Sequence, residues 1–164
     1  MFAVANADTP LSKPDLHAQL LAQARALLEG ERDATANAAN LASLVFHTLP
    51  DLNWAGFYWL KDGGLVLGPF QGKPACVRIA MGNGVCGAAA ATRRTVVVPD
   101  VHAFPGHIAC DSASESEVVV PVVKAGRLLG VLDLDSPRLA RFDDDDARGL
   151  EAIVAAFIQG TDLP

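Results

Sequence analysis

The chain has 164 residues, of which 51% are hydrophobic and 20% charged, a composition that predicts a folded domain rather than a disordered chain. Its formal net charge of -6 and the lack of a basic stripe argue against a nucleic-acid partner. No apolar run reaches the ~20 residues that span a membrane. The first ten residues lack the features of a secretory signal, so we expect a cytoplasmic protein with no membrane partner.

Two helices are predicted near the N-terminus. Residues 1–11 are expected to form a flexible tail that precedes a single domain at 12–160. Apolar side chains at helical spacing predict a helix from about residue 16 that stops at Gly30. A second helix should begin after Asp33 as its N-cap and end at Thr48.

Strands dominate the rest of the chain. β-branched and aromatic runs separated by glycine-containing turns predict two hairpins, two single strands, one short helix between those strands, and a C-terminal helix. In chain order these are a hairpin at 54–60 and 65–70, a strand at 76–79, a helix at 85–92, a strand at 95–98, a hairpin at 117–123 and 128–135, and a helix opening at 143–146. This order predicts an α+β fold with a central antiparallel sheet and helices packed on it.

Two features of these elements bear on function. The turn-rich segment 99–116 is long enough to favour a functional loop. The acidic run at 143–146 is most simply explained as complementing the positive end of the last helix.

The last predicted strand carries two carboxylates on one face. Alternation places Leu129, Val131, Asp133 and Asp135 on the same side, with the two acids about 6–7 Å apart. Buried together, such a pair would have to retain at least one proton, which suits proton donation at neutral pH. The alternative is that this is a solvated face. In a hairpin turning at 124–127, Glu117 should lie near residue 133 or 134, so that three carboxyls converge.

An aromatic pair is expected on another strand. Trp54 and Tyr58 are four residues apart and therefore share a face, and Gly56 between them should leave an open patch. This patch would suit a side chain the size of a thioether, although large aromatics on strands more often belong to a core.

Three cysteines, Cys76, Cys86 and Cys110, cannot all pair within one chain. They are therefore inert, metal-bound or redox-active. Cys110 lies in the polar loop and Cys86 at a predicted helix start, two places that favour reactivity. A zinc set of Cys86, Cys110, His102 and His107 is a weaker alternative, because the spacings lack the short clips of structural zinc sites.

Taken together, these motifs resemble the free methionine-(R)-sulfoxide reductases, which are single-domain GAF proteins. The resemblance extends from about residue 53 to residue 157. Its carriers are NWAGFY at 53–58, GPFQGKPAC at 68–76, GVCG at 84–87, PDVHAFPGHIACD at 99–111, SEVVVP at 116–121 and GVLDLDS at 130–136. One departure is Asn83, at a turn position where members of the family often carry a basic residue.

The resemblance implies a six-stranded GAF sheet, free methionine sulfoxide as substrate, thioredoxin as reductant and a homodimer, with no cofactor and no metal. It implies that Cys110 attacks the sulfoxide and that Cys76 resolves the product, with Cys86 a less certain participant. Glu117, Asp133 and Asp135 would bind and protonate the oxygen, and Trp54 and Tyr58 would hold the thioether end. The main rival is a GAF sensor module that binds a small ligand.

Overall fold

The computed structural model describes residues 10–108 and 110–164, so the predicted tail at 1–11 lies almost wholly outside the described residues. Four α-helices, one 3-10 turn and six strands follow one another along the chain. They are α1 (Lys13–Leu28), α2 (Ala34–Thr48), β1 (Trp54–Lys61), β2 (Gly64–Gly72), β3 (Arg78–Ala80), α3 (Gly84–Thr92), β4 (Val96–Val98), η1 (Val101–Ala103), β5 (Ser116–Lys124), β6 (Arg127–Ser136) and α4 (Asp144–Gly160). Within the described part, no helix is both long and apolar enough to cross a membrane.

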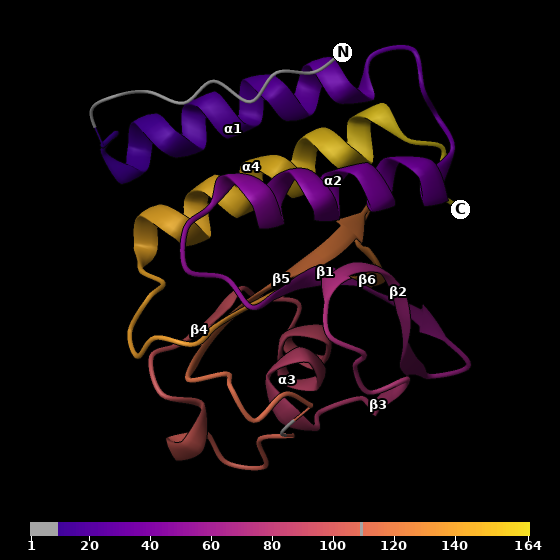
Figure 1. Ribbon diagram of the computed structural model, residues 1–164. Coiled ribbons are helices and arrows are strands. Elements are labelled where there is room, and N and C mark those ends of the chain that lie inside the picture. The colour runs from indigo at the N-terminus through magenta and orange to yellow at the C-terminus, as the bar shows by residue number, and fades with distance from the viewer. Residues whose placement is uncertain (1–9, 109) are drawn as a thin grey trace.

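One antiparallel sheet forms the middle layer, in the order β3-β2-β1-β6-β5-β4. Helices α2 and α4 cover one of its faces, with α1 packed on their outer side, whereas α3 and the loop after β4 cover the other face (Figure 1). The α+β prediction with six antiparallel strands is therefore confirmed.

Each face of the sheet has its own core. The three-helix side is sealed by apolar side chains such as Leu20, Leu41, Phe57 and Phe157, all almost fully buried. The α3 side is smaller and mixes apolar residues with Trp54, Tyr58 and Cys86. Polar and titratable groups can therefore lie on the α3 side of the sheet without disturbing the larger core on the other side.

Two helix starts follow the prediction. Asp33 caps α2 through a 2.8 Å bond from the Ala36 amide, and Asp143 caps α4 in a capping box with Asp146. The third strand differs from the prediction, because pairing with β2 begins only at Arg78. Cys76 therefore lies on an extended segment just before the strand.

A β-bulge in the second hairpin changes the predicted register. Lys124 pairs with Arg127 across a two-residue turn, and Leu129 is then left without a partner, because Val122 pairs with Gly130 and Val123 with Leu128. The extra residue places Leu129 against the three-helix core, so the prediction that it shares a face with Val131 is wrong.

The same bulge corrects the expected position of Glu117. The predicted partner was residue 133 or 134, but the one-residue shift sets Glu117 directly opposite Asp135. Asp133 lies opposite Val119, one position further along the same face.

Asp146 does more than complement a helix end. Its carboxylate is 1% exposed and lies 2.6 Å from the Lys13 ammonium, 2.9 Å from His17 Nε2 and 3.2 Å from the Arg141 guanidinium. Burial acts to raise the pKa of Asp146, but the hydrogen bonds from His17 and Lys13 and the Arg141 charge outweigh it and lower the pKa far below its usual range. This network ties α1 to the start of α4.

Replacing Asp146 with alanine should therefore destabilise the protein by about 3–5 kcal/mol, because buried Arg141 is left without its carboxylate. Asp145→Ala, which removes an exposed ion pair with Arg148, should cost less than about 1 kcal/mol. Urea unfolding of the two variants measures the difference. Equal effects would show that the network does not stabilise the contact between α1 and α4.

Candidate active site

A cavity opens on the α3 face of the sheet, where β1, β5 and β6 meet the start of α3 and the loop after η1. Every site residue predicted from the sequence except Cys76 lines it. The full lining is Trp54, Tyr58, Pro74, Ala75, Ile79, Asn83, Gly84, Val85, Cys86, His107, Ile108, Cys110, Asp111, Ser114, Glu117, Asp133 and Asp135. The fold thus gathers residues from five separate stretches of chain around one space.

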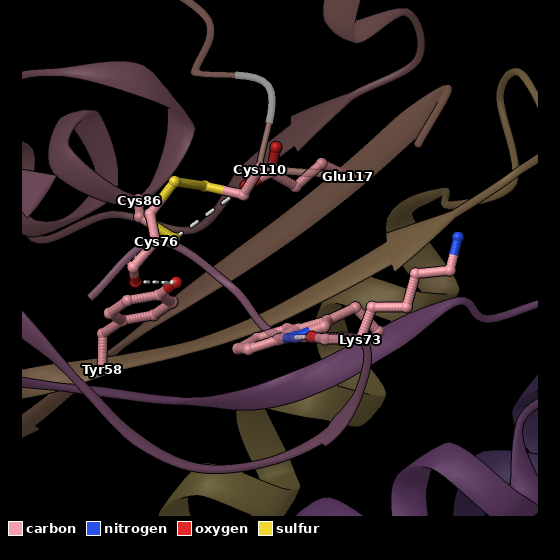
Figure 2. Close-up of a disulfide and its surroundings, with 7 residues drawn as sticks. Tyr58, Lys73, Cys76, Cys86, Cys110 and Glu117 are labelled. Atoms are coloured by element: carbon pink, nitrogen blue, oxygen red, sulfur yellow. Dashed lines mark hydrogen bonds between the residues drawn. A yellow bond between two sulfur atoms is a disulfide. The ribbon is translucent and has the colours of Figure 1, made fainter. Parts of the chain in front are cut away.

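Cys76 and Cys110 form a disulfide at the rim of this cavity, with an S–S distance of 2.07 Å (Figure 2). Cys110 belongs to the loop before β5 and lines the cavity, whereas Cys76 belongs to the segment before β3. The free cysteine is Cys86, which is buried at the first turn of α3. The bonded pair is the pair that the family resemblance implies.

Three carboxyls lie at the bottom of the cavity. Burial, and then the charges of Asp133 and Asp135, raise the pKa of Glu117 well above its usual range. Burial raises the pKa of Asp133 to about 6, although hydrogen bonds with Glu117 and Cys86 oppose the shift. Burial and the Asp133 charge likewise raise the pKa of Asp135. The alternative of a solvated face is wrong, because burial raises the pKa values of all three carboxyls.

Cys86 is part of the same cluster. Its thiol donates to Glu117 Oε1 at 3.9 Å, and burial followed by the charges of Asp133 and Glu117 raises the pKa of the thiol well above its usual value. The helix start therefore does not make Cys86 a thiolate, because the acids around it oppose that charge. Cys86 is instead a neutral hydrogen-bond donor.

The same atoms are the only potential metal ligands that converge in the described residues. Cys86, Glu117 and Asp133 offer atoms within 4.8 Å of one another. This is not the histidine–cysteine set considered from the sequence, in which the Cys110 sulfur is here bonded to Cys76. Since the pKa values of all three groups are raised, the donor set suits shared protons better than a cation.

Trp54 and Tyr58 share a face as predicted, with ring centroids 5.8 Å apart. The open patch expected over Gly56 is wrong, because a Cβ there would lie 2.3 Å from Phe70 Cβ and 2.7 Å from the Trp54 ring. Gly56 is needed instead to let the indole lie flat between Tyr58 and Phe70. The aromatic wall of the cavity therefore has no gap at Gly56.

Sequence reasoning missed a set of polar residues that hold the loop. The side-chain Nδ2 of Asn53 donates to Asp111 Oδ2 at 3.2 Å and to Ser114 Oγ at 3.0 Å. The backbone N–H of Asn53 donates to the backbone carbonyl of Asp135. The Lys73 ammonium lies 3.8 Å from Asp111. The sequence did offer one indication: Asn53 is a polar residue directly before β1, a strand whose first five residues are buried.

Two features of the cavity are left without partners inside the protein. Asn83 caps α3 without a side-chain hydrogen bond, so the first amides of that helix face the cavity. Asp133 Oδ1 is buried and has no hydrogen-bond partner. A ligand with an anionic group beside the α3 amides, and a polar group that hydrogen-bonds to Asp133 Oδ1, would supply the missing partners.

The acid cluster predicts a characteristic dependence of stability on pH. A carboxyl whose pKa is raised on folding binds more protons in the native state, so its contribution to stability is lost as the pH rises. For Asp133 the loss should run from about pH 4 to about pH 6 and amount to at most about 3 kcal/mol.

Asp133→Asn should therefore raise the free energy of unfolding at pH 7.5 and leave it almost unchanged at pH 4. Asp111→Asn should act in the opposite direction at pH 7.5, because hydrogen bonds from Ala113 and Asn53 lower the pKa of Asp111. Unfolding of the oxidised proteins at the two pH values measures both effects. A loss of stability at pH 7.5 in Asp133→Asn would contradict the raised pKa.

Known proteins resemble this chain in sequence and in fold. The GAF domain model matches residues 35–157. A protein named free methionine-R-sulfoxide reductase from Escherichia coli (strain K12) is 50% identical over 145 residues, which cover 88% of this chain and 88% of that protein.

Solved structures agree with the sequence comparison. The structure of a free methionine-R-sulfoxide reductase from Neisseria meningitidis, in complex with its substrate, matches with a TM-score of 0.90 and 43% identity over 95% of this chain and 94% of the other. A structure described as a putative GAF sensor protein from Burkholderia vietnamiensis matches with a TM-score of 0.89 and 62% identity over 92% and 96%.

Proposed function

This chain belongs to the GAF domain family and, within it, to the free methionine-R-sulfoxide reductases, and on that premise we propose that it reduces free methionine (R)-sulfoxide to methionine by cysteine chemistry. The observation that carries the proposal is the Cys76–Cys110 disulfide beside a cavity that is also lined by Glu117, Asp133 and Asp135. A nucleophilic sulfur and a proton source face each other across one space.

Cys110 is the proposed nucleophile. As a thiolate it attacks the sulfoxide sulfur, while the sulfoxide oxygen, a poor leaving group unless it gains protons, is protonated by the cluster of Glu117, Asp133 and Asp135. The protonated oxygen departs as water while the Cys110 sulfur bonds to the substrate sulfur. A water molecule then attacks the Cys110 sulfur, the new S–S bond breaks, and methionine leaves with its electron pair, so that the substrate sulfur is reduced by two electrons and Cys110 is left as a sulfenic acid. The raised pKa values of the acids support this role, because they keep protons available at neutral pH.

Cys76 then completes the oxidation. Its thiol attacks the Cys110 sulfenic acid, the oxygen departs as water, and the disulfide forms. The Cα atoms of the two cysteines are 5.6 Å apart, which is within the range that a disulfide spans. Two electrons from a dithiol such as thioredoxin would reopen this bond and restore both thiols.

The rest of the cavity fits a free amino acid. The carboxylate of the substrate would accept hydrogen bonds from the first amides of α3, where Asn83 stands in place of a basic residue. The thioether end would rest against the wall formed by Trp54 and Tyr58. Cys86 would hold Glu117 in place through its hydrogen bond and would not exchange electrons.

The resemblance further supports a homodimer, a location in the cytoplasm, and a single domain at residues 12–160. It also supports thioredoxin as the physiological reductant. Each of these is part of the proposal, and none of them is needed for the chemistry within the cavity.

Turnover of the separate R and S epimers tests the proposal. With dithiothreitol as reductant, the protein should release methionine from free methionine (R)-sulfoxide at least about 100-fold faster than from the S epimer. Binding of the sulfoxide without release of methionine would instead favour the sensor alternative.

A further inference from the structure

We propose that the segment from Lys73 to Arg78, which carries Cys76, is the docking surface for the dithiol reductase that reopens the disulfide. The inference rests on the redox role proposed above for the Cys76–Cys110 bond. It adds to that role the place at which the second protein binds and the sulfur that it attacks.

The first observation is the position of the two sulfurs relative to the cavity. Cys110 lines the cavity, whereas Cys76 does not; Cys76 is half-buried and Cys110 is exposed, so the preference for Cys76 rests on which sulfur is released toward the cavity. A thiolate arriving from outside that attacks Cys76 would displace Cys110 as the leaving thiolate. The nucleophile would thereby be released on the side where the substrate binds.

The second observation is that this segment is held rigidly from the inside. The Trp54 indole donates to the Lys73 carbonyl at 3.2 Å, the Tyr58 hydroxyl to the Cys76 carbonyl at 3.0 Å, and the Leu67 amide to the Val77 carbonyl at 2.9 Å. Figure 2 shows the Tyr58 bond beneath the disulfide. The segment leads into β3, an edge strand of the sheet, so its outer side is available to a partner.

The third observation is the character of the exposed side chains. Val77, next to Cys76, is 62% exposed, the largest value among the exposed large apolar residues of the described chain. Arg78 follows it directly and is exposed, in a chain with a formal net charge of -6, whereas the Lys73 ammonium at the start of the segment lies 3.8 Å from the Asp111 carboxylate. An exposed apolar side chain with a cation beside it suits a partner whose attacking group is a thiolate anion.

The exchange balances within the two proteins. The first thiolate of the reductase forms a mixed disulfide with Cys76, and the Cys76–Cys110 bond breaks. The second thiol of the reductase, once deprotonated, attacks the mixed disulfide and releases Cys76. The reductase ends as a disulfide, and this chain gains two electrons and two protons as two thiols.

Direct reduction of the oxidised protein by thioredoxin, without any sulfoxide, tests the surface. Val77→Ser should lower the second-order rate constant at least about fivefold, and the double variant Val77→Ser/Arg78→Gln at least about tenfold. The rate with dithiothreitol should change less than about twofold in both. Leu139→Ser is the matched control, because Leu139 is 60% exposed and lies outside the cavity lining.

Three results would overturn the inference. They are equal thioredoxin rates for Val77→Ser and Leu139→Ser, a parallel loss with dithiothreitol, and a mixed disulfide on Cys110 when a thioredoxin that lacks its second cysteine is used as a trap. Trapping on Cys76 supports it. Since no sulfoxide is present, failure of the proposed reductase activity would leave this test intact and would be recognised separately.

Discussion

Cys110→Ser is expected to lower kcat/KM for free methionine (R)-sulfoxide by at least about 10³-fold. A serine hydroxyl keeps the size of the side chain but is almost never ionised near neutral pH, so no strong nucleophile would face the sulfoxide sulfur. Methionine release with dithiothreitol, measured by chromatography, gives the loss directly.

Substrate binding provides the control for this variant. The α3 amides, the acids and the aromatic wall are unchanged in Cys110→Ser, so quenching of tryptophan fluorescence by the sulfoxide should still saturate. Retention of more than a tenth of the wild-type kcat/KM would show that another group attacks the sulfur.

Glu117→Gln and Asp133→Asn should each lower kcat by about 10²- to 10⁴-fold, the usual contribution of a positioned general acid. The amides keep the volume of the side chains but remove exchangeable acid protons from the base of the cavity. Steady-state assays between pH 5 and pH 9 would measure the loss and its pH dependence.

The pH profile separates proton donation from a packing defect. The Asp133 charge helps to raise the pKa of Glu117, so Asp133→Asn should lower that pKa and move the alkaline decline in rate to lower pH. Asp145→Asn replaces an exposed acid on α4 and should leave both the rate and its pH profile unchanged. An unshifted alkaline decline in Asp133→Asn would contradict a shared proton reservoir.

Much of the fold follows from local sequence. The helix capped by Asp33 forms as predicted and both hairpins turn where predicted, because their signals are contained within a few residues of each turn or cap. The convergence of Glu117, Asp133 and Asp135 also follows, since alternation along a strand fixes which side chains share a face.

The parts that were not predicted depend on contacts between distant segments. The bulge at Leu129 has no local marker, yet it decides that Glu117 faces Asp135. The space over Gly56 is filled by Phe70 from the neighbouring strand. Asp146 meets Lys13 from the other end of the chain, and alternation within one element cannot show such a contact.

In the proposed cycle, Cys110 attacks the sulfoxide sulfur and Cys76 resolves the product, with protons supplied by Glu117, Asp133 and Asp135. A single-turnover experiment on the fully reduced protein, without external reductant, is the sharpest test of this cycle. Free methionine (R)-sulfoxide should yield one methionine per chain, and titratable thiols should fall from three to one, with peptide mapping finding Cys86 free and Cys76 joined to Cys110. Methionine release with all three thiols intact, or a disulfide that includes Cys86, would contradict the account.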